Sequence, residues 1–321
     1  MKINYPALRK LITKYDVISF DIFDTVIKRD VYNPTDVFKI VGAMSADIDA
    51  QDFYEKRVDA ERCGREQSDN GEVRFEEIYE NIQYPSETRD VLKSRELETE
   101  KKVLISNHEM FELYQECVRL GKKIYFISDM YQPVETIKEW LGLCGYDTYN
   151  GVYVSCEYRK NKISGELYKI FLSEEGVNPS EVLHIGNSKK YDMFGAARVG
   201  IRAYLVPTHE QNALYMGHVS DDYADGYLYS YVNNRVARIT NRQEKLGYEM
   251  LGPVVWGYCS WVHKHAKNAD KLLFLARDME MFCEAYKLMY PQEADKCHYV
   301  RISRKSIFPA SLVATDSYYY V

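Results

Sequence analysis

The 321-residue sequence lacks paired cysteines, an apolar N-terminal segment and any long hydrophobic run. Its seven cysteines are scattered and include no Cys-x-x-Cys pair, which argues against both a disulfide framework and a zinc site. We therefore expect buried free thiols in a reducing compartment. Residues 1–6 contain no signal-peptide core, and the longest uncharged stretch, 250–262, is too short to cross a bilayer and contains Gly252 and Pro253. These absences predict a cytoplasmic protein without a membrane span.

An excess of positive charge is also lacking. Lys and Arg number 42 against 48 Asp and Glu, which gives a formal charge of −6 and argues against a nucleic-acid partner. Hydrophobic residues make up 46% and charged residues 28%, as in globular proteins, and the length corresponds to about two domains at ~150 residues each. The 29 tyrosines, including the run at 318–320, are interpreted as amphipathic rings that pack on helices and interfaces.

Short apolar segments of strand length recur along the chain, and each ends at a polar or turn-forming residue. These segments are 17–20, 123–127, 152–154, 182–185 and 202–206. Predicted helices separate most of them, at 133–143, 165–172 and 189–199. Apolar strands that alternate with helices predict an α/β fold with a doubly wound parallel sheet.

The stretch between the first two strands breaks this alternation, because about a hundred residues contain no clear strand. Its pattern predicts helices at 35–46, 51–67, 75–82 and 88–120. We interpret residues 30–118 as a helical cap inserted into a core formed by 1–29 and 119–208, since such an insertion is placed to cover a site at the sheet edge.

The remaining residues, 209–321, predict a second, partial α/β segment. A helix at 244–269, interrupted at Gly252 and Pro253, precedes a buried strand at 271–275. A helix at 280–290 and a strand at 297–302 follow. The segment is either an incomplete unit or is packed against the first domain by its tyrosines.

Polar residues follow the predicted strands at the points where the strands end. They are Asp21, Ser128, Lys162, Asn187 and Asp192. Because the carboxyl ends of parallel strands share one edge of a sheet, these side chains are expected to converge. A carboxylate, a hydroxyl and a cation at one place suit nucleophilic attack on an electrophile with negatively charged oxygens.

The stretches 20–25, 127–129, 162–168 and 184–196 resemble, in order, the motifs of the haloacid dehalogenase (HAD) superfamily. The insertion is similar to that family's C1-type cap. The runs 246–253 and 274–278 also resemble large bacterial HAD-type proteins associated with glycosyltransferase modules, which implies a polysaccharide-building context.

The resemblance implies catalytic and substrate-binding roles for five residues. Asp21 would be a nucleophile that forms a covalent aspartyl intermediate, Ser128 would hold an oxyanion, and Lys162 would neutralise charge beside Asp21. Thr25 and Asp129 would bind the substrate.

A magnesium site is implied as well. Its ligands would be Asp21, the Phe23 carbonyl, Asn187 and Asp192, a sparse oxygen set of the kind that Mg²⁺ accepts. Asn187 stands where the family usually has an acid, and loss of that charge weakens metal binding.

The phosphatase pattern also places a general acid two residues after the nucleophile, where this chain has Phe23. On an extended chain Asp24 faces the opposite side, so we interpret Asp24 as a turn or cap residue. The leading hypothesis is a Mg²⁺-dependent phosphate-ester hydrolase that acts on a small phosphorylated metabolite. The alternatives are a metal-free dehalogenase-like hydrolase, which needs no acid, and a catalytically impaired scaffold used for binding.

The other charged candidates receive structural interpretations. We expect one helix of the cap to carry an exposed face of ion-paired side chains. Its members are Arg57, Glu61, Arg62 and Arg65. The alternative is that Arg57 or Arg65 binds an anionic group of the substrate. His108 and His184 are interpreted as structural, and the pair Arg277 and Asp278 as either a buried ion pair or a second site.

Overall fold

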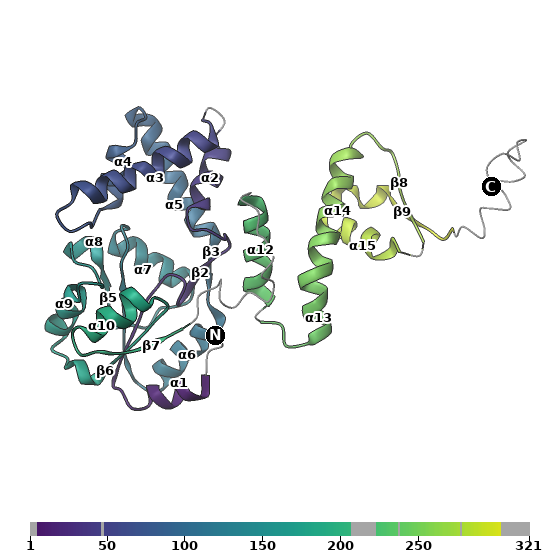
Figure 1. The fold of residues 1–321 in the computed structure, drawn as a ribbon. Coiled ribbons are helices and arrows are strands. Elements are labelled where there is room, and N and C mark those ends of the chain that lie inside the picture. Colours follow the sequence, from purple (N-terminus) through teal and green to yellow (C-terminus); the bar gives the residue numbers. More distant parts are fainter. Residues whose placement is uncertain (1–4, 46–47, 207–222, 237, 277, 303–321) are drawn as a thin grey trace, which may run out of the picture. The chain divides into compact units, whose positions relative to one another are not determined.

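A computed structural model describes residues 5–45, 48–206, 223–236, 238–276 and 278–302. The chain forms two compact units, Met1–Arg238 and Ile239–Val321. Each unit is described by itself (Figure 1).

The first unit is built on a five-stranded parallel sheet with strand order β5-β4-β1-β6-β7. Its strands are β1 (Val17–Phe20), β4 (Lys123–Ser128), β5 (Gly151–Val154), β6 (Val182–Gly186) and β7 (Arg202–Leu205). Every residue of β1 is buried, as expected for a central strand with helices on both faces. The prediction of a doubly wound α/β core is confirmed.

Helices cover both faces of this sheet (Figure 1). One face packs against α1 (Tyr5–Ile12), α6 (His108–Arg119) and α7 (Val134–Leu143). The other packs against α9 (Glu166–Glu175) and α10 (Gly195–Ala197). Three short elements, α8 (Ser155–Tyr158), η1 (Pro179–Glu181) and η2 (Lys189–Phe194), lie in the connections.

The insertion after β1 is helical and has its own apolar core. Its helices are α2 (Asp36–Ala43), α3 (Ala50–Gln67), α4 (Phe75–Asn81) and α5 (Ser86–Val103). The predicted single helix at 88–120 is wrong, because α5 ends at Val103 and α6 begins at His108. Between them β3 (Leu104–Ser106) pairs antiparallel with β2 (Ile27–Arg29), and strands of three residues leave no readable periodicity in the sequence.

Helix α12 (Tyr223–Val236) contacts Arg29 and Asp30, where the chain leaves β2 and enters the insertion. Asn234 donates hydrogen bonds from Nδ2 to the Arg29 carbonyl and to Asp30 Oδ1, both at 2.9 Å. Arg235 forms an ion pair with Asp30 at 2.8 Å. The segment predicted to start at residue 209 therefore contains a helix that belongs to the first unit.

The second unit has a two-stranded parallel sheet, β8 (Leu272–Leu275) and β9 (Cys297–Val300). Its helical elements are α13 (Arg242–Leu246), η3 (Gly247–Leu251), α14 (Gly252–His265), α15 (Glu280–Met289) and η4 (Pro291–Lys296). The predicted break at Gly252 and Pro253 is instead the first turn of α14, where proline is tolerated. The expectation that β8 is buried is wrong, since only Phe274 is buried in it.

Two further expectations concern cysteines and membrane spans. All seven cysteines are free thiols, and five of them are buried. None of the described helices combines the length and the apolarity needed to cross a bilayer. Arg277 and the tyrosine run at 318–320 lie outside the described residues.

Candidate functional site

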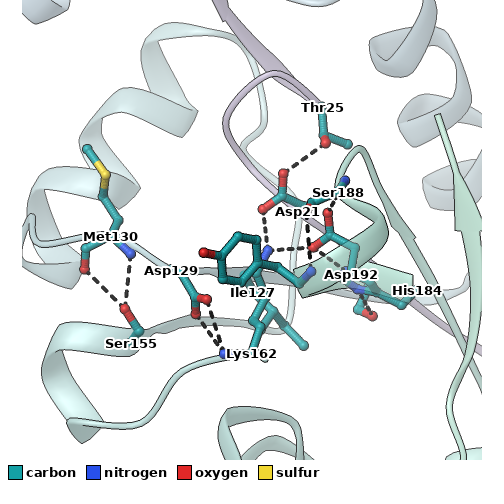
Figure 2. A network of polar contacts seen from close by, with 12 residues as sticks. Asp21, Thr25, Ile127, Asp129, Met130, Ser155, Lys162, His184, Ser188 and Asp192 are labelled. Atoms are coloured by element: carbon teal, nitrogen blue, oxygen red, sulfur yellow. Dashed lines mark hydrogen bonds and ion pairs between the residues drawn. The ribbon is translucent and has the colours of Figure 1, made fainter. Parts of the chain in front are cut away.

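The predicted polar residues line one cavity at the carboxyl edge of the sheet, and Figure 2 shows three of them, Asp21, Lys162 and Asp192, in contact. Asp21 follows β1, Ser128 is the last residue of β4, and Asn187 follows β6. Lys162 lies in the loop after α8, and Asp192 lies in η2. In-register pairing of β1 with both β4 and β6 places these strand ends side by side.

Lys162 bridges two carboxylates at the centre of the site (Figure 2). Its Nζ lies 2.6 Å from Asp21 Oδ1 and 2.6 Å from Asp192 Oδ1. Thr25 donates a hydrogen bond to the other oxygen of Asp21, Oδ2, at 2.8 Å. All four side chains are buried, so the Asp21 carboxylate is held from both oxygens in one orientation.

Asp192 is fixed by His184 of β6 and by the N–H of Ser188, and Ser19 of β1 holds His184 in turn. His184 Nε2 lies 3.3 Å from Asp192 Oδ1, and His184 Nδ1 lies 2.9 Å from the Ser19 hydroxyl. The Ser188 N–H donates to Asp192 Oδ2 at 2.7 Å. His184 therefore orients Asp192 while remaining outside the centre, in agreement with the structural role predicted for it.

Two glycines permit the close approach of these groups. A Cβ atom on Gly186 would lie 2.3 Å from Asp192 Cγ, and one on Gly195 would lie 2.2 Å from the Lys162 carbonyl oxygen. The Lys162 N–H is also fixed, because it donates to both carboxylate oxygens of Asp129 at 2.9 and 3.2 Å. Only glycine fits at positions 186 and 195 without displacing the site.

Burial and charge act in opposite directions on the pKa values here. Burial raises the pKa of Asp21 to about 7, although Lys162 opposes the shift. Burial alone would lower the pKa of Lys162, but Asp192 and Asp21 outweigh it and raise that pKa well above its usual value. Lys162 similarly overcomes the burial of Asp192 and lowers its pKa. Burial lowers the pKa of His184, which favours its neutral form.

A cavity of about 680 Å³ opens over this network. Core residues that line it include Asp21, Ser128, Asp129, Lys162 and Asn187. The insertion contributes residues from α2, α3, α5 and the segment between α3 and α4. This size suits a small molecule, and the helical insertion forms one wall of the space that the molecule would occupy.

Phe23 fills the position where a general acid was sought. Its ring packs edge-on against Trp140 with centroids 6.1 Å apart, and the Arg29 guanidinium lies 4.3 Å from the ring centroid on its face. Asp24 is a turn residue, as predicted, but its φ is +57°. That left-handed backbone removes the extended-chain argument that separated it from Asp21, and Asp24 lines the same cavity.

Two other sequence expectations require correction. Thr25 does not line the cavity; it is fully buried and its hydroxyl is committed to Asp21, so it positions the carboxylate. Arg57 is neither exposed nor available to an anion, because it is fully buried in a bidentate ion pair with Glu96, with both N···O distances 2.8 Å. Arg65 reaches the cavity, but it is paired with Glu61 at 2.9 Å.

The donor set at the sheet edge fits a magnesium ion. Asp21 and Asp192 are two carboxylates that share the single cation of Lys162, so a second cation can offset the remaining formal negative charge. Asn187 lines the same cavity and has a neutral amide oxygen to offer. Mg²⁺ commonly binds through one or two carboxylates and keeps waters or substrate phosphate as its other ligands. Among the described residues no three His, Cys, Asp or Glu side chains form a metal-binding group.

Comparisons with known proteins yield structural neighbours only. No protein-family model matches the chain, and no curated protein matches it. A HAD phosphatase from Thermococcus onnurineus is 17% identical, with a TM-score of 0.45, over 63% of this chain and 91% of its own. A HAD-family enzyme from Bacteroides thetaiotaomicron, solved with magnesium and inorganic phosphate, is 17% identical, with a TM-score of 0.44, over 62% of this chain and 98% of its own.

A 2-haloacid dehalogenase from Pseudomonas syringae pv. tomato is also similar. It is 17% identical, with a TM-score of 0.42, over 63% of this chain and 90% of its own. The role of the site in this chain is therefore argued from its own geometry. The C1 type of the cap and the association with glycosyltransferase modules stay predictions.

Proposed function

We propose that the protein is a HAD-type hydrolase that cleaves phosphate esters of small metabolites through an aspartyl intermediate on Asp21. One observation carries the proposal: a buried carboxylate at a strand end is held by Thr25 and Lys162 and opens onto a small-molecule cavity. An ion pair with a purely structural role would not need to line a cavity.

In the proposed reaction an Asp21 oxygen attacks phosphorus, and the bond between phosphorus and the ester oxygen breaks. Lys162 and Ser128 line the cavity, where their ammonium group and hydroxyl can stabilise charge on the phosphoryl oxygens. Water then attacks the phosphorus of the aspartyl phosphate, which releases phosphate and restores Asp21. Asp21, the Phe23 carbonyl, Asn187 and Asp192 would hold Mg²⁺, which supplies positive charge to the phosphoryl group when bound.

The leaving alcohol needs a proton that Phe23 cannot supply, and we assign this proton to Asp24. Asp24 is the only carboxyl group among residues 22–29, the described turn and strand that follow Asp21, and it lines the same cavity. An Asp24→Asn variant should lose hydrolysis of alkyl phosphates more than that of p-nitrophenyl phosphate, because p-nitrophenolate leaves without a proton. Equal losses on both substrates would remove Asp24 from this role.

Phe23 supports one alternative function, that of a dehalogenase. An apolar ring beside the nucleophile suits displacement of halide from a halogenated acid. The two functions differ in their metal requirement. For a phosphatase, a chelator should abolish release of phosphate and added Mg²⁺ should restore it. Release of halide that is unaffected by the chelator would favour the dehalogenase.

The deciding variant is Asp21→Asn, which retains the shape of the side chain and removes the nucleophile. We expect phosphate release to fall by about 10³-fold or more, because attack by the carboxylate is the step that it loses. Asp16→Asn is the matched control, since the Asp16 side chain is 92% exposed before β1. Absence of turnover in the wild-type protein across phosphorylated and halogenated compounds would refute the enzyme proposal and favour a binding scaffold.

A further inference from the structure

Glu72 is a nearly buried acid of the insertion that faces the cavity without a partner. It lies between α3 and α4, is 5% exposed and lines the cavity over Asp21. Its carboxylate makes no hydrogen bond or ion pair with any described residue. Neither of its oxygens is among the fully enclosed polar atoms that lack a partner.

The backbone of Glu72 is held on both sides, so the residue has a fixed place in the wall of the cavity. Its N–H donates to Asn70 Oδ1 at 3.1 Å, and its carbonyl accepts from Arg159 Nη1 at 2.9 Å. Arg159 also pairs with Glu77 of α4. Since no described residue donates to the side-chain carboxyl group, its oxygens remain free to accept a hydrogen bond from a molecule in the cavity.

The other charged side chains of the cavity do not supply that donor. Arg29 is paired with Glu100 at 3.0 Å, Arg65 with Glu61 at 2.9 Å, and Lys162 with the two aspartates of the site. These are the three cations among the described lining residues, against seven Asp and Glu, an excess of four negative charges. A phosphate dianion and a divalent cation cancel one another, so this excess persists when both are bound.

We propose that Glu72 binds the non-reacting end of the substrate, and that this end carries a protonated amino group. An ionised carboxylate only accepts hydrogen bonds, so its partner must be a donor, and the negative excess of the cavity favours a cationic one. The substrate class is then an amino-alcohol phosphate ester. This inference rests on the proposed function, because the phosphate end is assigned to Asp21 and Lys162.

Binding can be measured without turnover in the full-length Asp21→Asn protein with Mg²⁺. The ligands are aminopropyl, hydroxypropyl and propyl phosphate, which differ at the remote end alone. We expect calorimetry to show the amino ester binding about tenfold more tightly than the propyl ester, a ratio typical of one charge-assisted hydrogen bond. Adding Glu72→Gln should bring this ratio close to one without weakening the binding of propyl phosphate.

The control is Glu80→Gln, a change of the same kind at an exposed position of α4 outside this cavity, which should retain the preference. Thermal unfolding of each variant verifies that the fold is intact. A preference for hydroxypropyl phosphate, or an amino preference that survives Glu72→Gln, overturns the inference.

Turnover by the wild-type protein separates this inference from the proposed function. Hydrolysis of all three esters at equal efficiency refutes the role of Glu72 and leaves the phosphatase in place. Tight, Glu72-dependent binding of the amino ester without any hydrolysis supports the role of Glu72 and refutes the phosphatase.

Discussion

Replacement of Gly186 by alanine tests whether close packing at the end of β6 holds the site together. The new Cβ would lie 2.3 Å from Asp192 Cγ, whereas ordinary contact begins at 3.4 Å, so one of the two groups must move by about 1 Å. The backbone cannot easily retreat, because the Gly186 carbonyl accepts from Val206 N at 2.8 Å. The displacement therefore falls on Asp192.

Two measurable effects follow from that displacement. Overpacking of this kind costs about 1–3 kcal/mol, which should lower the free energy of unfolding in urea by that amount. A shift of about 1 Å also breaks the 2.6 Å contact between Asp192 and Lys162, and misplacement on that scale costs about 10²-fold in rate. Phosphate release from p-nitrophenyl phosphate with Mg²⁺ is the assay for the second effect.

Gly142→Ala is the matched control in the same unit. Gly142 lies in α7, and the nearest atom to its added Cβ is Asp147 Oδ1 at 3.5 Å, an ordinary contact. Alanine there should leave stability unchanged or raise it by up to about 1 kcal/mol, with activity retained. Equal stability and activity in the two variants would refute the argument that Gly186 makes room for Asp192.

Three further predictions concern the insertion and its surroundings. Arg57→Met should lower the free energy of unfolding by about 3–5 kcal/mol, because it removes the ion-pair partner of the buried Glu96 carboxylate. Arg62→Ala, at an exposed ion pair, is the control and should change that free energy by less than about 1 kcal/mol when both are measured by urea titration. Burial raises the pKa of Asp129 from 3.8 to about 6. Between these two values the folded protein holds a proton that the unfolded chain has released, so stability should fall as pH rises from about 4 to about 6. Asp129→Asn should reduce that slope, part of which remains because burial also raises the pKa of Asp21, and an unchanged slope would contradict the assignment. Arg159→Gly keeps the left-handed backbone at φ +52° but loses the side-chain contacts with Glu72 and Glu77, so amide exchange around these residues should accelerate while exchange in the sheet does not.

The core of the fold could be predicted from sequence because its signals are local and repeated. Each sheet strand is a short apolar run that ends at a polar residue, and the parallel order then brings Asp21 and Asn187 to one edge. The three-residue strands β2 and β3 could not be predicted in this way. Their pairing joins residues far apart in the chain, and only tertiary contact reveals it.

The supporting residues of the site were harder to predict than its centre. Thr25 was recognised by its motif, but its commitment to Asp21 depends on the turn that follows β1. Glu72 and Arg57 carry no sequence signal that separates a partnered acid or base from an unpartnered one. Their difference arises because α5 supplies Glu96 to Arg57, whereas no described residue forms a hydrogen bond or ion pair with the carboxylate of Glu72.

The pairing of β2 with β3 has a consequence for engineering. The Asp30 N–H donates to the Val103 carbonyl at 2.7 Å, so the two ends of the helical insertion meet where they leave the sheet. The chain thus enters and leaves the insertion at one place. If the insertion were removed, a short turn could connect β2 to β3 without altering the order of the strands. Exchange of the insertion for another of the same kind would replace one wall of the cavity and leave the sheet edge with Asp21 and Lys162 unchanged, so the chain is suited to domain grafting.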